Sequence, residues 1–129
     1  MGKYLNSTAT LSSIIVGALS YMLGGWDSLT IALLIFMALD YLTGVLKALY
    51  DKKLSSKAGF RGIIKKVVIL VLVTTAVVVE RELGIPAIRE VTIVFFAVNE
   101  ALSIIENSVE IGIPIPEKLK EALLQIREK

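Results

Sequence analysis

The sequence contains no cysteine and no histidine. Disulfide bonds, thiolate nucleophiles and zinc sites built on these residues are therefore excluded, together with the most common general base at neutral pH. Ser12 and Ser13 have no histidine to activate them. The formal net charge of +2 is too small to indicate a nucleic-acid partner. We therefore expect no enzyme, no cofactor, no metal site and no binding to nucleic acid.

Apolar residues, in contrast, are in excess. The 129 residues have the length of one domain, but 55% of them are hydrophobic and the mean hydropathy is +0.74. Ordinary soluble domains contain about 45–50% apolar residues. The composition therefore indicates a single domain, residues 1–129, whose surface is covered by lipid.

The apolar residues are grouped in four windows. A hydrocarbon core about 30 Å thick requires about 20 apolar residues in a helix, and the windows lie at residues 8–25, 28–50, 63–79 and 88–110. They lack the alternation of a barrel strand, so we expect helices. The predicted fold class is an all-α polytopic membrane protein with four transmembrane helices. The first window is short and rich in Ser, Thr and Gly, which leaves a three-span protein or a cleavable signal peptide as alternatives.

The segments between the windows predict the topology. The turn 24–28, GGWDS, joins the first two spans as a hairpin. The segment 51–66 carries six basic residues against the lone Asp51, so we expect it in the cytoplasm. Contact of this segment with anionic lipids is a further interpretation. Segment 80–90 has only two basic residues, Arg81 and Arg89, which suits the outside. With four spans, both termini are then cytoplasmic.

The C-terminal segment 116–129 predicts a short amphipathic helix. Pro114 and Pro116 end the preceding span, and Pro116 suits the first position of a new helix. An apolar stripe follows at helical spacing, formed by Leu119, Ala122, Leu123 and Ile126. We expect this helix at the cytoplasmic membrane interface or on another subunit; a loosely ordered tail is the alternative.

Polar residues lie inside two of the predicted spans. An ionisable residue at the centre of a bilayer costs about 2.5–3.5 kcal/mol, so such residues usually face protein or water. Asp40, Thr43, Gly44 and Lys47 share one face of the second span. In the fourth span a stripe is formed by Asn99, Ser103, Glu106 and Glu110, and it is widened by Glu100 and Asn107.

Counting depth from the ends of the predicted spans pairs some of these groups. Lys47 and Glu106 lie at similar depth, so we expect them to pair, within one subunit or between two. No cation lies at the depth of Asp40, which should therefore need Asn99, a hydroxyl group, a proton or water. The polar stripes either hold one bundle together or face a water-filled hole between copies. The candidate oligomerisation or pore-lining residues are Asp40, Thr43, Gly44, Lys47, Asn99, Glu100, Ser103, Glu106 and Asn107.

Three blocks of the chain resemble a known family. GGWDSLTIALLIFMALDYLTGVLKAL, KKLSSKAGFRGIIKK and NEALSIIENSVEIGIPIPEKLKEALLQI are similar, in order and spacing, to the hallmark blocks of the phage lysis and toxin-secretion holins. The resemblance covers nearly the whole chain from about Gly24. It implies a protein of the bacterial cytoplasmic membrane that forms homo-oligomers and opens lesions for an endolysin or toxin.

The resemblance also implies which residues take part in assembly or line the lesion. Those that fall in the matching blocks are Asp40, Gly44, Asn99, Glu100, Glu106 and Asn107. A small ion or proton-coupled transporter is the alternative function, with Asp40 and Glu100 carrying protons. The chain shows no internal repeat and no Gly or Pro break within a span, which are typical of transporters. A purely structural membrane subunit is a third possibility.

Overall fold

The structure, a computed structural model, describes residues 2–128 and is helical almost throughout. Met1 and Lys129, the limits of the predicted domain, lie outside the described residues. The all-α class is confirmed. Five helices occupy the described part of the chain: α1 Gly2–Leu23, α2 Ser28–Tyr50, α3 Ser56–Leu83, α4 Ile88–Ile111 and α5 Glu117–Glu128.

The predicted windows at 28–50 and 88–110 match α2 and α4 closely, whereas α3 begins well before the predicted residue 63. The reason is a cap in the basic segment. The Ser55 hydroxyl oxygen accepts a hydrogen bond from the backbone N–H of Ala58 at 3.3 Å, which satisfies an otherwise unpaired donor of the first turn. Most of the segment predicted as a cytoplasmic loop is therefore the start of a helix.

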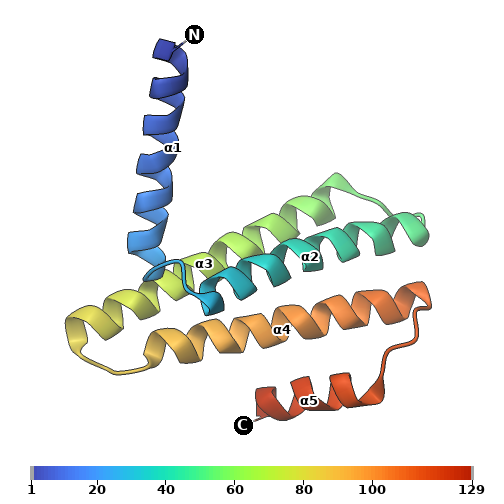
Figure 1. Cartoon of the computed structure of the whole chain (residues 1–129). Helices are drawn as coiled ribbons and strands as arrows, with labels where there is room; N and C mark the ends of the chain where they lie inside the picture. Colours follow the sequence, from blue (N-terminus) through green and yellow to red (C-terminus); the bar gives the residue numbers. More distant parts are fainter. Residues whose placement is uncertain (1, 129) are drawn as a thin grey trace.

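α2, α3 and α4 pack together as up-and-down neighbours, and α5 folds back along α4 (Figure 1). α4 packs mainly on α2 and also contacts α3. The side chains buried between the helices are apolar: Leu23, Leu33, Met37, Val73 and Ile93. The 24–27 and 84–87 turns thus meet at one end of the bundle, and the 51–55 turn lies at the other.

α1 stands away from this bundle (Figure 1). Its apolar side chains are largely exposed, including Leu11, Ile14 and Tyr21. The hairpin expected from GGWDS is therefore wrong as a packed pair, because α1 does not run alongside α2. Gly24 and Gly25 have φ values of +81° and +112°, which turn the chain outward.

Two helices are long and apolar enough, within residues 2–128, to cross a membrane by length and composition. They are α2, with a mean hydropathy of 2.1, and α3, with 2.4. Only 17% of either apolar window is buried inside the chain, so the protein itself does not cover these helices as a soluble core would. α1 and α4 do not meet the same test, and the prediction of four spans is not confirmed.

α5 has the predicted amphipathic pattern. It begins at Glu117, one residue later than expected, because the carbonyl of Pro116 accepts the first hydrogen bonds, from Leu119 at 3.1 Å and Lys120 at 3.4 Å. Leu123 and Leu124 are half-buried in the helix that packs on α4. Leu119 and Ile126 remain about half exposed. Its place at a membrane interface stays a prediction.

Candidate functional site

The centre of the bundle contains three charged side chains from three different helices. The Lys66 ammonium of α3 donates to Asp40 Oδ2 of α2 at 2.8 Å and to Glu100 Oε2 of α4 at 2.6 Å. The three side chains are only 10–17% exposed. We call Asp40, Lys66 and Glu100 the ion-pair triad. Its formal charge is −1, and it ties all three helices together.

The triad lies near the middle of each helix. Each member is about ten residues from the helix end nearest the 51–55 turn, at Tyr50, Ser56 and Ile111. At 1.5 Å per residue this distance is roughly 15 Å. In helices that cross a hydrocarbon core about 30 Å thick, the triad would therefore lie close to the bilayer centre.

Asn107 orients the Asp40 carboxylate and also contacts Thr43. The Asn107 amide donates to Asp40 Oδ1 at 3.2 Å, to the Asp40 carbonyl at 3.4 Å and to the Thr43 hydroxyl at 3.0 Å. The Thr43 hydroxyl in turn donates to the Asp40 carbonyl at 3.1 Å. Both oxygens of Asp40 are therefore engaged, one by an amide and one by an ammonium group.

A cleft of about 1100 Å³ leads from the 51–55 turn to the triad. It runs between α2, α3 and α4. Ser103 and Asn107 lie on its α4 side, and Leu54 and Ser55 line it at the 51–55 turn. Tyr41 of α2 reaches across to α3, where a Cβ on Gly59 would lie 3.1 Å from the Tyr41 hydroxyl oxygen. Gly59 therefore allows α2 and α3 to approach closely beside the cleft.

Several of the predicted residues come together in this region. Asp40, Thr43, Glu100 and Asn107 form one hydrogen-bonded network with Lys66. The inward stripe of α4 is therefore Glu100, Ser103 and Asn107, which share one face at i, i+3 and i+7. The prediction centred the stripe on Asn99, Ser103, Glu106 and Glu110, and gave Glu100 and Asn107 only as its edges.

Two predictions about contacts within one chain need correction. Lys47 pairs with Glu110 and not with Glu106, which is exposed. Glu110 lies one further turn along α4 and so reaches the end of α2 nearest the 51–55 turn. Asn99 is half-buried next to the inward stripe, does not line the cleft and forms no hydrogen bond with Asp40. A Cβ on Gly44 would meet only the Asn107 amide nitrogen at 3.8 Å, an ordinary contact, so Gly44 is not needed for close helix approach within one chain.

The prediction that Asp40 has no cation at its depth is also wrong. It followed from starting the third helix at residue 63, which placed Lys66 at the membrane surface. With α3 starting at Ser56, Lys66 lies almost three turns inside the helix. Its basic neighbours Lys57, Arg61 and Lys65 are exposed, and Lys66 alone among these four turns inward.

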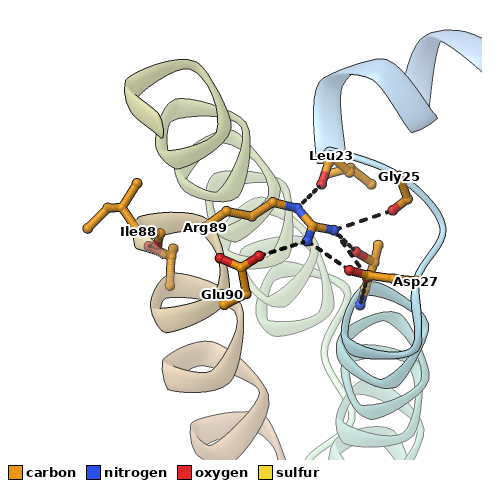
Figure 2. Close-up of polar contacts among 8 residues, drawn as sticks. Leu23, Gly25, Asp27, Ile88, Arg89 and Glu90 are labelled. Carbon is orange, nitrogen blue, oxygen red and sulfur yellow. Dashed lines mark hydrogen bonds and ion pairs between the residues drawn. The ribbon is translucent and has the colours of Figure 1, made fainter. Parts of the chain in front are cut away.

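A second polar site, which the sequence analysis did not identify, lies at the opposite end of the bundle (Figure 2). The Arg89 side chain of α4 is 6% exposed and donates to both carboxylate oxygens of Asp27, at 2.8 and 3.1 Å. It also donates to the Leu23 carbonyl at 2.7 Å, the Gly25 carbonyl at 3.4 Å and the Thr30 hydroxyl at 2.6 Å. These contacts, the Arg89 network, fasten the start of α4 to the turn between α1 and α2.

Asp27 has two roles in this network. Its side chain caps α2 by accepting from the backbone N–H of Thr30 at 3.0 Å. The hydrogen bonds from Arg89, followed by the bond from Thr30, hold the pKa of Asp27 well below its ordinary value of 3.8. Asp27 therefore stays ionised through any physiological pH, and the Arg89 guanidinium keeps its counter-ion.

The sequence offered a signal for this site. Arg89, Ile93 and Glu100 are all buried and lie three turns apart or less on one face of α4. That spacing indicates that Arg89 faces the bundle and does not belong to a loop. Arg81, the other arginine of segment 80–90, lies over the Tyr21 ring at 4.3 Å and holds the end of α1 to α3.

Within residues 2–128, no three His, Cys, Asp or Glu side chains converge as a metal-binding group. The carboxylates of the triad are satisfied by the Lys66 ammonium and the Asn107 amide. The arrangement is a hydrogen-bonded cluster of charged side chains that joins three helices.

Comparison with known proteins identifies the family. Residues 17–128 match the bacteriophage holin family. A 14.9 kDa protein in the nagH 3′ region of Clostridium perfringens, described as uncharacterised, is 46% identical over 112 residues, which cover 85% of each chain. An uncharacterised protein of C. perfringens strain 13 is 43% identical over 122 residues, 92% of this chain and 90% of the relative. An uncharacterised protein of Listeria monocytogenes is 42% identical over 105 residues, 81% of this chain and 75% of the relative.

No solved structure matches the chain significantly. The family match covers α2 to α5 and the end of α1, and so includes the triad and the Arg89 network. The family match, together with two long apolar helices that the chain leaves largely uncovered, indicates that this chain is a membrane protein. It belongs to the bacteriophage holin family.

Proposed function

We propose that this chain is a multi-pass protein of the bacterial cytoplasmic membrane that assembles with copies of itself and opens lesions through which an endolysin or a toxin leaves the cell. The whole chain forms a single membrane domain. Its family membership supports a holin-like function in general. The observation that carries the proposal is the ion-pair triad, which places three ionised groups at the same depth in three packed helices.

In the proposed topology α2, α3 and α4 cross the bilayer, and the 51–55 turn with its basic neighbours faces the cytoplasm. α4 carries five charged residues, Arg89, Glu90, Glu100, Glu106 and Glu110. Its charges at Arg89, Glu100 and Glu110 are each paired within the chain, with Asp27, Lys66 and Lys47 respectively. This pairing supports α4 as a spanning helix, because the cost of an intramembrane charge falls when it is paired.

α1 is the proposed fourth span, which requires it to turn from its place in Figure 1, across the direction of the bundle, until it runs parallel to α2. It has 22 residues, which at 1.5 Å each is enough for a bilayer core. Its exposed apolar side chains suit lipid or another subunit. A crossing α1 places both termini in the cytoplasm, with the Arg89 network at the outer surface.

The proposed opening step separates α3 from α2 and α4. Asp40 and Glu100 would then lose the Lys66 ammonium and face each other without a counter-ion. Water in a lumen between subunits stabilises such groups, so the separated state is favoured only where a lesion forms. Membrane potential can bias the step, since one charge moved across 100 mV is worth about 2.3 kcal/mol. The candidate residues of α2 and α4 would line the lesion.

The test is expression in a bacterium together with a cytoplasmic endolysin that has no export signal. We expect an abrupt loss of membrane potential, followed by release of folded endolysin and lysis. Asp40→Leu should shift the time of lysis or abolish it at equal membrane accumulation. Leu42→Ile is the matched control, because Leu42 is 51% exposed on the outer face of α2.

Other outcomes point to the alternative functions. A transporter would pass ions or small solutes without releasing the endolysin, and a structural subunit would do neither. If endolysin stays inside cells that accumulate the protein in their membrane, the proposed function is wrong.

A further inference from the structure

The cleft is unusual for a space within a membrane bundle, because its walls are partly apolar but its inner end is formed by charged and polar side chains. It begins beside Ser55 and Lys47 near the 51–55 turn and ends at the triad. We propose that the cleft is a water-filled vestibule that opens on one side of the membrane only and brings solvent to the triad before any lesion opens. The vestibule rests on the membrane topology of the proposed function.

Acyl chains are poor occupants of this space. Its inner end is lined by the charged groups of Asp40, Lys66 and Glu100 and by the polar groups of Ser103 and Asn107. An ionised group against hydrocarbon is costly, and charged side chains within membranes normally face protein or water. A cleft of this size has room for water, and the polar groups at its inner end supply hydrogen-bonding partners.

Beyond the triad the bundle is closed by apolar side chains. Leu33, Met37, Val73 and Ile93 pack between α2, α3 and α4 on the side away from the cleft. Leu33, Val73 and Ile93 are at most 1% exposed. These four residues form an apolar barrier with no polar groups to hold water.

The barrier is itself enclosed at its far end. The Arg89 network joins the start of α4 to the 24–27 turn, and Arg89 and Thr30 are buried there. Along α4 the distance from Arg89 to Glu100 is roughly 16 Å at 1.5 Å per residue. Solvent from that side therefore meets first a closed hydrogen-bond network and then the apolar barrier.

One-sided access makes the triad a sensor of one compartment. Water in the vestibule carries the solution potential of its own side up to Asp40, Lys66 and Glu100. The transmembrane potential then drops mainly across the apolar barrier, which lies directly beside the triad. A change in membrane potential would in this way act on the ion pairs that hold α3 to α2 and α4.

The chain lacks cysteine, so single cysteines report accessibility without background. Ser103→Cys and Ala97→Cys form a matched pair on α4, on opposite sides of Glu100: Ser103 lines the cleft, and Ala97 packs against the apolar core. Leu42→Cys, exposed on α2, reports the lipid side. Lys53→Cys in the turn marks the side of the membrane on which the cleft opens.

The probe is MTSET, a permanently cationic and membrane-impermeant thiol reagent, added to sealed vesicles of either orientation before any loss of membrane potential. We expect Ser103→Cys to react from the same side as Lys53→Cys and only from that side. It should react at least about tenfold faster than Ala97→Cys and Leu42→Cys, because a thiol in apolar surroundings forms little of the reactive thiolate. If Ser103→Cys does not accumulate, Gly44→Cys replaces it, since that position lines the cleft and has room for a Cβ.

Three results would overturn the vestibule: reaction of Ser103→Cys no faster than Leu42→Cys, reaction from the side opposite to Lys53→Cys, or equal reaction of Ser103→Cys and Ala97→Cys. These results are independent of endolysin release. Release without labelling would refute the vestibule alone, and labelling without release would refute the proposed function alone.

Discussion

Replacement of Lys66 by methionine removes the only cation of the triad while keeping a side chain of similar length. Two ion pairs, of 2.8 and 2.6 Å, are lost at once. Because the three side chains are at most 17% exposed, solvent compensates little of this loss. Breaking a buried pair by removing one partner costs about 3–5 kcal/mol, because a charge is left without compensation.

Lys65→Met is the matched control. Lys65 is the next residue of α3 and is exposed, so its replacement should change the free energy of unfolding by less than about 0.5 kcal/mol. The assay is unfolding of the purified protein in mixed micelles by increasing fractions of a denaturing detergent, followed by circular dichroism. Lys66→Met should lower the free energy of unfolding by about 3 kcal/mol or more.

The triple variant Lys66→Met, Asp40→Asn, Glu100→Gln tests the reason for this loss. It removes all three charges but keeps their approximate shapes, so no carboxylate is left without a counter-ion. The triple variant should lose less free energy of unfolding than the three single variants lose in sum, and the difference, the interaction energy, should be about 0.5–3 kcal/mol. Additive losses, or a Lys66→Met variant as stable as Lys65→Met, would refute the reasoning.

Three further predictions concern the hydrogen-bond networks, and each is measured by the same unfolding assay. Gly24 and Gly25 both have positive φ, but only a Cβ at Gly24 would meet Arg89, 2.7 Å from its Cδ. Gly24→Ala should therefore displace Arg89 from its hydrogen bonds, and charge-assisted hydrogen bonds are worth about 1.5–3 kcal/mol each. We expect Gly24→Ala to destabilise the protein by about 2 kcal/mol more than Gly25→Ala. Equal losses would contradict this role of Arg89. Stability should fall as the pH drops below about 3.8, because the folded-state pKa of Asp27 lies below that ordinary value and protonation removes its bonds; Asp27→Asn should lose this part of the acid dependence. Asn107→Leu should cost about 1–3 kcal/mol, because the Asp40 Oδ1 atom would lose its amide donor, and a neutral effect would show that water replaces the amide.

Hydrophobic windows predicted α2 and α4 well because both helices are bounded by strong local signals. Asp27 caps the start of α2, and Gly112 ends α4 in the left-handed conformation with φ of +101°. The start of α3 was missed because a run of basic residues resembles a surface loop. The Ser55 cap and the Lys57, Arg61 and Lys65 spacing of an exposed helical face were both present in that run.

The pairing of the polar residues was harder to predict than their presence. Asp40, Glu100 and Asn107 were identified from their positions within apolar windows, and all three take part in one network. Their partner Lys66 depends on the register between helices, which shifts with each error in a helix end. Lys66, Leu70, Val73 and Val77 share one inward face of α3, and that periodicity could have revealed it.

The most direct test of the whole account is the depth of the triad in a lipid bilayer. A nitroxide spin label attached at Leu39→Cys, which adjoins Asp40 and points outward with 41% exposure, reports this depth through its collision rates with oxygen and with a polar nickel chelate. We predict oxygen collisions typical of the bilayer centre, roughly 15 Å from either edge of the hydrocarbon core. Nickel collisions typical of the headgroup region or of water would contradict it.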